Sequence, residues 1–199
     1  ACCGQALELY FGTTELGPRD FLAVATPGAG KTTFALRLAR ELLDRRVITA
    51  VTVVCPTEHL KRQWAESAAR VGIKIDPEFK NAQGRTARDF QGVAVTYATV
   101  AAHPALHRGR TENRKTLVIL DEIHHAGDGL SWGDAIREAF EPAARRLGLS
   151  GTPFRTDINP IPFVTYEEGP DGVRRSRADY TYGYGPALAD GVVRPVIFL

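Results

Sequence analysis

The chain alternates between short apolar runs and segments in which apolar residues recur at helical spacing. In the short runs, neighbouring positions are both hydrophobic and several residues are β-branched. This pattern is typical of strands that are covered on both faces of a sheet. We therefore expect strands at residues 21–26, 47–55, 93–96, 116–120 and 147–150.

The segments between these strands have the pattern of amphipathic helices. Residues 31–43 carry apolar side chains on one face and charged side chains between them, which indicates a helix with a single core face. Thr57 follows Pro56 in a position suited to an N-cap, so we expect a helix over 57–70, and a short one over 134–140. Strands that alternate with helices predict an α/β fold, a three-layer sandwich with a mainly parallel central sheet.

After Pro153 the runs become shorter and the turns richer in polar residues. Residues 163–166 and 173–182 flank the sequence Glu-Glu-Gly-Pro-Asp-Gly, which predicts a β-hairpin. Residues 186–190 predict one helical turn, and the apolar residues 192–199 predict an exit strand. We expect this part of the chain to extend from the α/β domain.

The composition is that of an ordinary globular domain, with 199 residues, 44% hydrophobic residues and a net charge of +2. It excludes collagen-like, low-complexity and largely disordered classes. The charge is too small to identify a partner, so any nucleic-acid binding must come from a local patch. Cys2, Cys3 and Cys55 form no disulfide framework, which favours a reducing, cytoplasmic compartment. No apolar run is long enough to cross a membrane, and the absence of Met suggests a piece of a longer polypeptide.

The residues between the first strand and the first helix have the character of a phosphate-binding loop. Two glycines allow the backbone to curl, so that N–H groups and the helix N-terminus face an anion. Lys31 is expected to reach the β- and γ-phosphates of ATP, and Thr32 to place its hydroxyl on Mg²⁺. Ala25 stands where the general pattern has its first glycine. The expected nucleotide-binding residues are Thr26, Pro27, Gly28, Ala29, Gly30, Lys31, Thr32 and Thr33.

An acidic motif, Asp121-Glu122-Ile123-His124, follows the expected strand at 116–120. Two carboxylates at the end of a buried strand are costly unless a cation or water satisfies them. Mg²⁺ on the nucleotide is the obvious cation, so Asp121 and Thr32 are the expected metal ligands. Glu122 is then the expected base that orients the attacking water. The alternative is a solvated loop that carries an acidic pair.

Together these motifs resemble superfamily 2 helicases and translocases of the DEAD/DEAH-box type, here with a DExH-like acidic sequence. The resemblance covers five motifs in the order that the family has them. The segments similar to motifs I, Ia, Ib, II and III are Thr26 to Thr33, Pro56-Thr57 with Leu60 and Trp64, Val95-Thr96-Tyr97, Asp121 to His124, and Ser150-Gly151-Thr152-Pro153.

The resemblance implies the first of two RecA-like lobes, over residues 1–155. Residues 156–199 would then form the hairpin extension and lead toward a second lobe. The implied catalytic residues are Lys31, Asp121, Glu122 and His124. The implied mechanical link between nucleotide and motif III is His124 with Ser150 and Thr152. Without the family, these last three residues are equally compatible with a surface histidine and an ordinary strand-end turn.

Two features depart from the family. The upstream glutamine that reads adenine is represented only by Gln5, at an unusual offset. Motifs IV to VI, which include an arginine that stabilises the transition state, are absent from these 199 residues. Hydrolysis is therefore expected to need a second lobe.

The family resemblance assigns the loops after the second and third strands to the sugar-phosphate backbone of DNA or RNA. The expected contacts are Pro56, Thr57, Arg62, Thr96 and Tyr97. A hydroxyl at a helix start can bond a phosphate while the helix dipole favours the anion, and His59, Lys61 and Arg62 add positive charge. Such contacts predict salt-sensitive binding, mainly to a single strand and with little sequence preference.

Two other charged segments have simpler interpretations. Three arginines, at 174, 175 and 177, precede tyrosines at 180, 182 and 184. The tyrosines could stack on bases, but we favour packing of the hairpin against the lobe. The basic segment 108–115 is interpreted as a solvated loop.

Three hypotheses for function follow. The first is the ATP-binding lobe of a helicase or translocase. The second is the motor part of a restriction or nuclease system, which makes the same residue predictions. The third is a nucleotide-dependent binding module that does not hydrolyse ATP, which the intact Lys31, Thr32, Asp121 and Glu122 disfavour.

Overall fold

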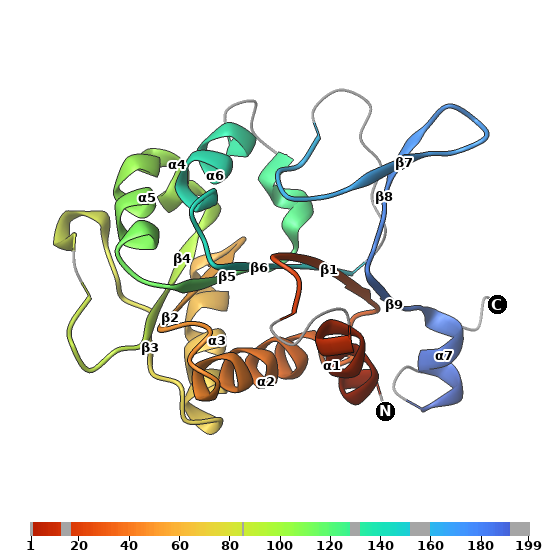
Figure 1. Cartoon of the computed structure of the whole chain (residues 1–199), viewed down its shortest axis with the longest axis horizontal. Coiled ribbons are helices and arrows are strands. Elements are labelled where there is room, and N and C mark those ends of the chain that lie inside the picture. Colours follow the sequence, from red (N-terminus) through yellow and green to blue (C-terminus); the bar gives the residue numbers. More distant parts are fainter. Residues whose placement is uncertain (1, 13–16, 85, 128–131, 152–159, 192–199) are drawn as a thin grey trace.

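The structure is a computed structural model of the chain, and Figure 1 shows its layers and the course of the chain. It describes residues 2–12, 17–84, 86–127, 132–151 and 160–191.

A seven-stranded sheet runs through the middle of the molecule, in the order β3-β4-β2-β5-β6-β1-β9 (Figure 1). Every neighbouring pair in it is parallel. The predicted α/β class with a mainly parallel sheet is therefore confirmed. The strands are β1 (Asp20–Ala25), β2 (Ala50–Cys55), β3 (Ile75–Asp76), β4 (Gly92–Thr96), β5 (Thr116–Leu120), β6 (Arg145–Ser150) and β9 (Tyr180–Tyr182).

Helices cover both faces of the sheet (Figure 1). On one face lie α1 (Cys2–Gly12), α2 (Lys31–Asp44) and α3 (Glu58–Arg70). On the other lie α4 (Tyr97–Ala102), α5 (Pro104–Glu112) and α6 (Trp132–Phe140). Two 3₁₀ turns, η1 (Asn81–Gln83) and η2 (Ile123–Gly127), and the short helix α7 (Tyr184–Ala189) complete the helical elements of the described residues.

Successive side chains of the central strands enter different hydrophobic clusters. In β5, Leu117 and Ile119 pack with the α1–α3 layer, whereas Val118 and Leu120 pack with the opposite layer. All four are fully buried. Alternation of side chains across a strand explains why a continuous apolar run is required when both faces are covered.

The segment after the lobe differs from its prediction. β7 (Tyr166–Glu168) and β8 (Arg174–Ser176) form the expected antiparallel hairpin. The expected second strand, 173–182, is however divided, because its last three residues form β9 and pair in parallel with β1. Asp179 fixes this change of sheet, since its backbone N–H donates to Leu22 O (2.9 Å) and its carboxylate accepts from Leu22 N (2.7 Å). The predicted exit strand at 192–199 lies outside the described residues.

The tyrosines at 180, 182 and 184 do not share one strand face. Tyr182 is buried against Ala25 and Ala187, and Tyr180 packs beside it. Tyr184 lies in α7 and is 43% exposed. The packing interpretation is therefore confirmed for the first two.

One local prediction was wrong in part. Residues 108–112 of the basic segment 108–115, interpreted as a solvated loop, belong to α5, which Pro104 begins at a position where proline is favoured. Arg114 and Lys115 lie after the helix, outside any helix or strand. Within α5, Arg110 is partly buried; it donates to Gly84 O and Thr86 Oγ1 and lies over the Phe79 ring. The N-terminal helix α1 is held against the sheet, and its Tyr10 is 1% exposed. No described helix is long and apolar enough to cross a membrane.

A histidine fixes α5 to its surroundings. His107 is 1% exposed, and its Nε2 lies 3.0 Å from Asn81 Oδ1. Its ring makes edge contacts with Phe79 and Phe140. Burial, with Arg110 and His103 nearby, lowers the pKa of His107 from 6.5 to about 4. The neutral ring is thus the form that the fold accepts.

This depressed pKa makes stability depend on pH. The unfolded chain binds the His107 proton at a higher pH than the folded chain does. The free energy of unfolding should therefore fall as the pH drops from about 6.5 to about 4, by ~3 kcal/mol at most for this group. The free energy of unfolding is measured by urea unfolding at several pH values across this range. Its slope against pH, which reports the protons bound on unfolding, should be smaller in His107→Gln by up to one proton. The exposed His59→Gln is the control, and an unchanged slope in His107→Gln would contradict the assignment.

Candidate nucleotide and metal site

The loop between β1 and α2 has the backbone that phosphate binding requires. Gly28 and Gly30 have φ of 82° and 84°, a region that favours glycine. Ala29 N donates to Thr26 O (3.1 Å), which closes the turn, and α2 begins after Gly30 without a side-chain cap. The first N–H groups of α2 are thus available to an anion.

β9 supports this loop from the neighbouring position in the sheet. Thr26 N donates to Tyr182 O (3.1 Å), and Ala29 packs against the cluster of Ala25, Tyr182 and Ala187. Among the described residues, Thr26 Oγ1 is a buried oxygen without a hydrogen-bond partner. An orphaned hydroxyl in such a loop is consistent with a site that an anion completes.

Lys31 joins the loop to the acidic motif. Its Nζ donates to Ala25 O at 3.1 Å and lies 3.3 Å from Glu122 Oε1. The predicted meeting of the lysine-threonine corner with the acidic pair, about ninety positions later in the chain, is therefore confirmed as a spatial arrangement. Its role in binding stays a prediction.

Asp121 is fixed at three points. Its backbone N–H donates to Val54 O (2.8 Å), its backbone carbonyl accepts from the Tyr97 hydroxyl (2.9 Å), and its Oδ2 accepts from Trp64 Nε1 (2.8 Å). Burial raises the pKa of Asp121, and the adjacent Glu122 acts in the same direction. The Trp64 hydrogen bond and the Lys31 charge lower it. A bound cation would likewise stabilise the carboxylate.

Thr32 and Asp121 line one cavity of about 300 Å³, together with Trp64 and other residues of α3. A hydroxyl and a carboxylate are oxygen donors of the kind that Mg²⁺ prefers. The described residues contain no group of three His, Cys, Asp or Glu side chains that could hold a metal alone. The donor set therefore fits Mg²⁺ that takes further oxygens from phosphate and water.

Glu122 adopts a strained conformation, with φ of 47°. Its Oε2 accepts from Gly151 N (3.1 Å) and lies 3.6 Å from His124 Nδ1, which in turn is 3.5 Å from Ser150 Oγ. The acidic motif thus contacts the end of β6 directly. Thr152, the third expected member of this link, lies outside the described residues.

Four of the expected strand-binding residues separate into an exposed pair and a buried pair. Thr57 is exposed at the N-terminus of α3 and makes no side-chain cap, and the adjacent Pro56 is partly exposed. Thr96 is 6% exposed and bonds Thr99, and Tyr97 is 1% exposed. We therefore correct the interpretation of the Thr96 and Tyr97 side chains: both are buried and hold the fold together.

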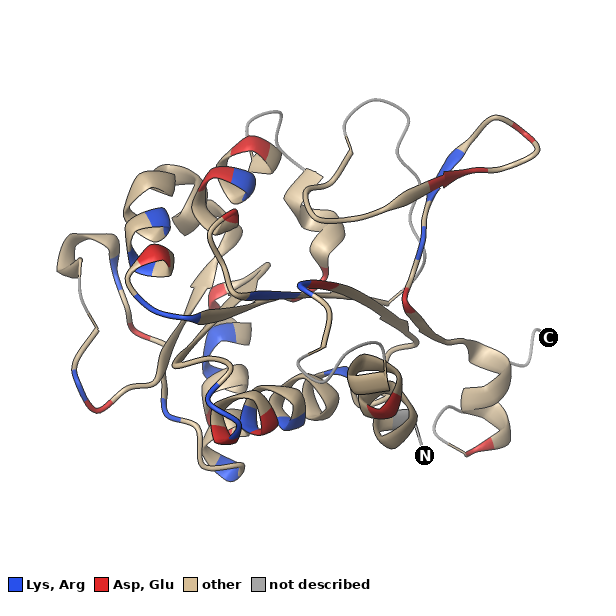
Figure 2. Ribbon diagram, in the orientation of Figure 1, with Lys and Arg blue, Asp and Glu red and all other residues tan. Residues whose placement is uncertain are grey.

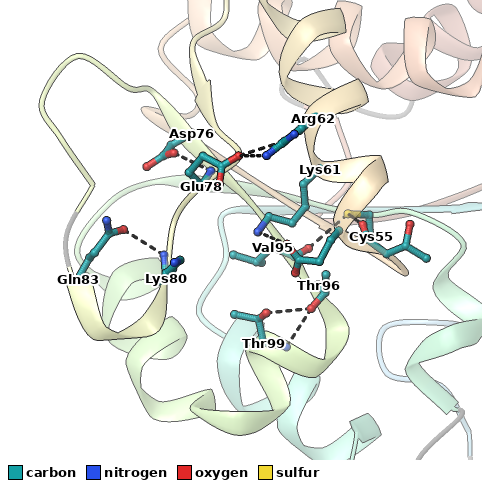
Figure 3. Close-up of polar contacts among 12 residues, drawn as sticks. Cys55, Lys61, Arg62, Asp76, Glu78, Lys80, Gln83, Val95, Thr96 and Thr99 are labelled. Atoms are coloured by element: carbon teal, nitrogen blue, oxygen red, sulfur yellow. Dashed lines mark hydrogen bonds and ion pairs between the residues drawn. The ribbon is translucent and has the colours of Figure 1, made fainter.

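The positive charge expected beside α3 is largely paired with acids, one at i,i+3 spacing on the helix and one from a separate segment. Lys61 bonds Glu58 at 2.9 Å, and Arg62 lies 3.1 Å from Glu78, which follows β3 (Figure 3). Both signs also occur together along α2 (Figure 2). The surface near Thr57 is consequently less basic than a count of its cations indicates.

This fold and site define the class of the protein. A parallel sheet, a glycine-rich loop before α2 and an acidic motif after β5 make the chain the first RecA-like lobe of a superfamily 2 helicase. Residues 5–155 match the family described as the type III restriction enzyme, res subunit, and the chain belongs to this family. The resemblance inferred from the motifs is confirmed.

Relatives among curated proteins are much longer than this chain. Uncharacterized protein Rv2917 of Mycobacterium tuberculosis is 64% identical over 195 residues, which are 98% of this chain and 32% of that protein. ML1624 of Mycobacterium leprae is 64% identical over 182 residues, which are 92% of this chain and 30% of that protein. The chain thus spans about a third of the length of these relatives.

Solved structures share the fold. The restriction-modification enzyme LlaGI, in complex with a DNA substrate mimic, matches 96% of this chain and 20% of its own, with a TM-score of 0.65 and 14% identity. The SWI2/SNF2 ATPase core of Sulfolobus solfataricus, in complex with DNA, covers 75% of this chain and 31% of its own, with a TM-score of 0.61 and 17% identity. The Hef helicase domain of Pyrococcus furiosus covers 67% and 30%, with a TM-score of 0.54 and 25% identity.

Gly30 has a positive φ, so a side chain at this position should destabilise the folded chain. A Cβ there would meet no atom within 4 Å, so the cost is conformational. We expect Gly30→Ala to lower the free energy of unfolding by about 1 kcal/mol. Gly109→Ala, in the open interior of α5, should raise it by about 0.5–1 kcal/mol. Urea unfolding of both variants measures the difference, and a stabilised Gly30→Ala would contradict the loop geometry.

Proposed function

We propose that this helicase-like motor domain binds Mg²⁺-ATP and is the ATP-binding lobe of a helicase or translocase. The observation that carries the proposal is the 3.3 Å contact between Lys31 Nζ and Glu122 Oε1, because it puts a phosphate-seeking cation and a candidate base at one point. The lobe would comprise residues 1–155, with 156–199 as an extension that returns β9 to the same sheet.

Each residue of the site has a role in this proposal. Loop N–H groups and Lys31 bind the β- and γ-phosphates, and Lys31 leaves its contact with Glu122 to do so. Thr32 and Asp121 hold Mg²⁺, which supplies neutralisation of phosphate charge when bound. Glu122 orients the attacking water and accepts its proton. His124 and Ser150 carry the change at Glu122 to the end of β6.

Turnover requires a second lobe in this proposal. Transition-state charge on the phosphate is commonly stabilised by an arginine, which adds about 10³-fold or more to the rate. The longer relatives have room for a second RecA-like lobe that could supply one. The 199 residues alone should therefore bind nucleotide and hydrolyse it slowly.

The strand would lie across the carboxyl edge of the sheet, at the start of α3. Thr57 and the exposed N–H groups of α3 are suited to phosphates of single-stranded DNA or RNA. The paired state of Lys61 and Arg62 favours weak binding in the isolated lobe. This part of the proposal is supported by the exposure of Thr57 and its uncapped helix.

A second candidate is the motor of a restriction system, and the description of the matching family favours it. Both candidates use this lobe in the same way. An ATP-dependent cut in duplex DNA by the longer protein would select the restriction system. Nucleotide binding without turnover by that protein would instead select a non-hydrolysing module.

Two substitutions separate nucleotide binding from turnover. Lys31→Ala should weaken ATP binding by about tenfold or more, because a charge-assisted contact to phosphate is lost. Glu122→Gln should retain binding and lower turnover by about 10²–10⁴-fold. Calorimetry on the chain measures binding, and phosphate release by the longer protein measures turnover. Arg37→Ala, an exposed cation on the same helix, is the control. The proposal fails if the wild-type chain does not bind ATP.

A third substitution tests the strand-binding face. Glu78→Gln should release Arg62 and tighten binding of single-stranded DNA at low salt. The plot of log affinity against log salt should steepen by about 0.7 for one more phosphate contact. Glu41→Gln releases Arg45 at the far end of α2 and serves as the matched control. Fluorescence anisotropy with a labelled oligonucleotide measures both, and equal effects of the two variants would place the strand elsewhere.

A further inference from the structure

Asp121 is hydrogen-bonded to the elements that carry the candidate strand-binding loops: it donates its backbone N–H to β2 and accepts from side chains of α3 and α4. Val54 belongs to β2, which ends just before Pro56-Thr57. Trp64 belongs to α3, which starts after Thr57, and Tyr97 is the first residue of α4. The expected metal ligand is thus tied to both loops at the carboxyl edge of the sheet.

The indole of Trp64 is placed to control one carboxylate oxygen. Trp64 is 2% exposed, and its N–H donates to Asp121 Oδ2 at 2.8 Å. It also lines the cavity that Thr32 and Asp121 share. Because a buried N–H needs an acceptor, the bond holds the carboxylate in one orientation, and the indole engages only one of its two oxygens.

Helix α3 connects this bond to the surface. Trp64 lies seven residues after Thr57, about two turns or ~10 Å along the helix. A helix behaves as a rigid element. A displacement of the N-terminus of α3 on phosphate binding would therefore also displace the indole of Trp64. Tyr97 gives α4 a similar connection through the backbone carbonyl of Asp121.

We propose that Trp64 is a positioning residue of the metal site and that, together with Tyr97, it couples the strand-binding loops to Asp121. The inference rests on the function proposed above. In it, Trp64 does not touch nucleotide or metal, but its N–H sets the direction of the carboxylate that does. Outer hydrogen bonds of this kind commonly change metal affinity by about 10–100-fold.

The test measures Mg²⁺ binding, without any need for turnover. Mg²⁺ is titrated calorimetrically into the full chain with a non-hydrolysable ATP analogue. Trp64→Phe should raise the Mg²⁺ concentration at half-saturation by about tenfold. Analogue binding in EDTA should be unchanged. Trp132→Phe, a partly buried tryptophan of α6, is the control. If Trp64→Phe does not fold, 3-benzothienylalanine at this position keeps the bicyclic shape and removes the N–H.

A double-mutant cycle distinguishes positioning from packing. In an Asp121→Asn background the metal-binding carboxylate is gone, so Trp64→Phe should cause no further loss of Mg²⁺ affinity. A packing role would give additive losses in the two backgrounds, and additivity would overturn the proposal. A wild-type chain without Mg²⁺-dependent binding would instead contradict the proposed function itself. Wild-type binding that Trp64→Phe leaves unchanged would contradict this inference alone.

Coupling is measured by repeating the titration with a saturating oligothymidine. Coupling between two ligands is reciprocal. If the strand changes the affinity for Mg²⁺, then Mg²⁺ must change the affinity for the strand by the same factor. The measured quantity is the ratio of the Mg²⁺ affinity with oligothymidine to the Mg²⁺ affinity without it. This ratio should differ from one in the wild-type chain and approach one in Trp64→Phe and Tyr97→Phe. The same ratio in all three proteins, including a ratio of one, would overturn the coupling.

Discussion

The contact between Lys31 and Glu122 depends on the direction of the strands. β1 and β5 are parallel and separated by β6, so both end at the same edge of the sheet. That edge brings a loop lysine to within 3.3 Å of an acid from a distant part of the sequence. An antiparallel arrangement would put the two groups at opposite edges. The candidate site is therefore a consequence of topology, to which the helices add burial and the uncapped N-terminus of α2.

Much of the fold was predictable because its signals are local. β5 occupies the expected residues 116–120, and its apolar run has one interpretation when both faces are covered. β9 could not be predicted in the same way, since three residues carry almost no periodicity and their pairing with β1 depends on Asp179 reaching Leu22. The helical part of the segment 108–115 was interpreted as a solvated loop because of its positive charges. The sequence does not show that Arg110 is held by Gly84 and Thr86 and is thereby partly buried.

The candidate site, like the fold, could be predicted only in part from the sequence. Glycines and a lysine at fixed spacing predict a phosphate-binding loop, and adjacent acids after a strand predict the group that meets it. Trp64 and Tyr97 lie in the segments similar to motifs Ia and Ib, but nothing in the sequence indicates that they bond Asp121, because an aromatic residue on an amphipathic helix or after a strand is expected in the core in any case. Only the folded arrangement places their N–H and O–H groups on Asp121. Similarly, the cations near Thr57 are neutralised by acids, one of which is contributed by the segment after β3.

The most direct test of the central claim is the position of the metal. A crystal of the chain grown with Mn²⁺ and a non-hydrolysable ATP analogue gives an anomalous signal that locates the ion. The account predicts a single peak between Thr32 and Asp121, with the terminal phosphates beside Lys31. A peak elsewhere, or a nucleotide bound with Lys31 still paired to Glu122, would contradict it.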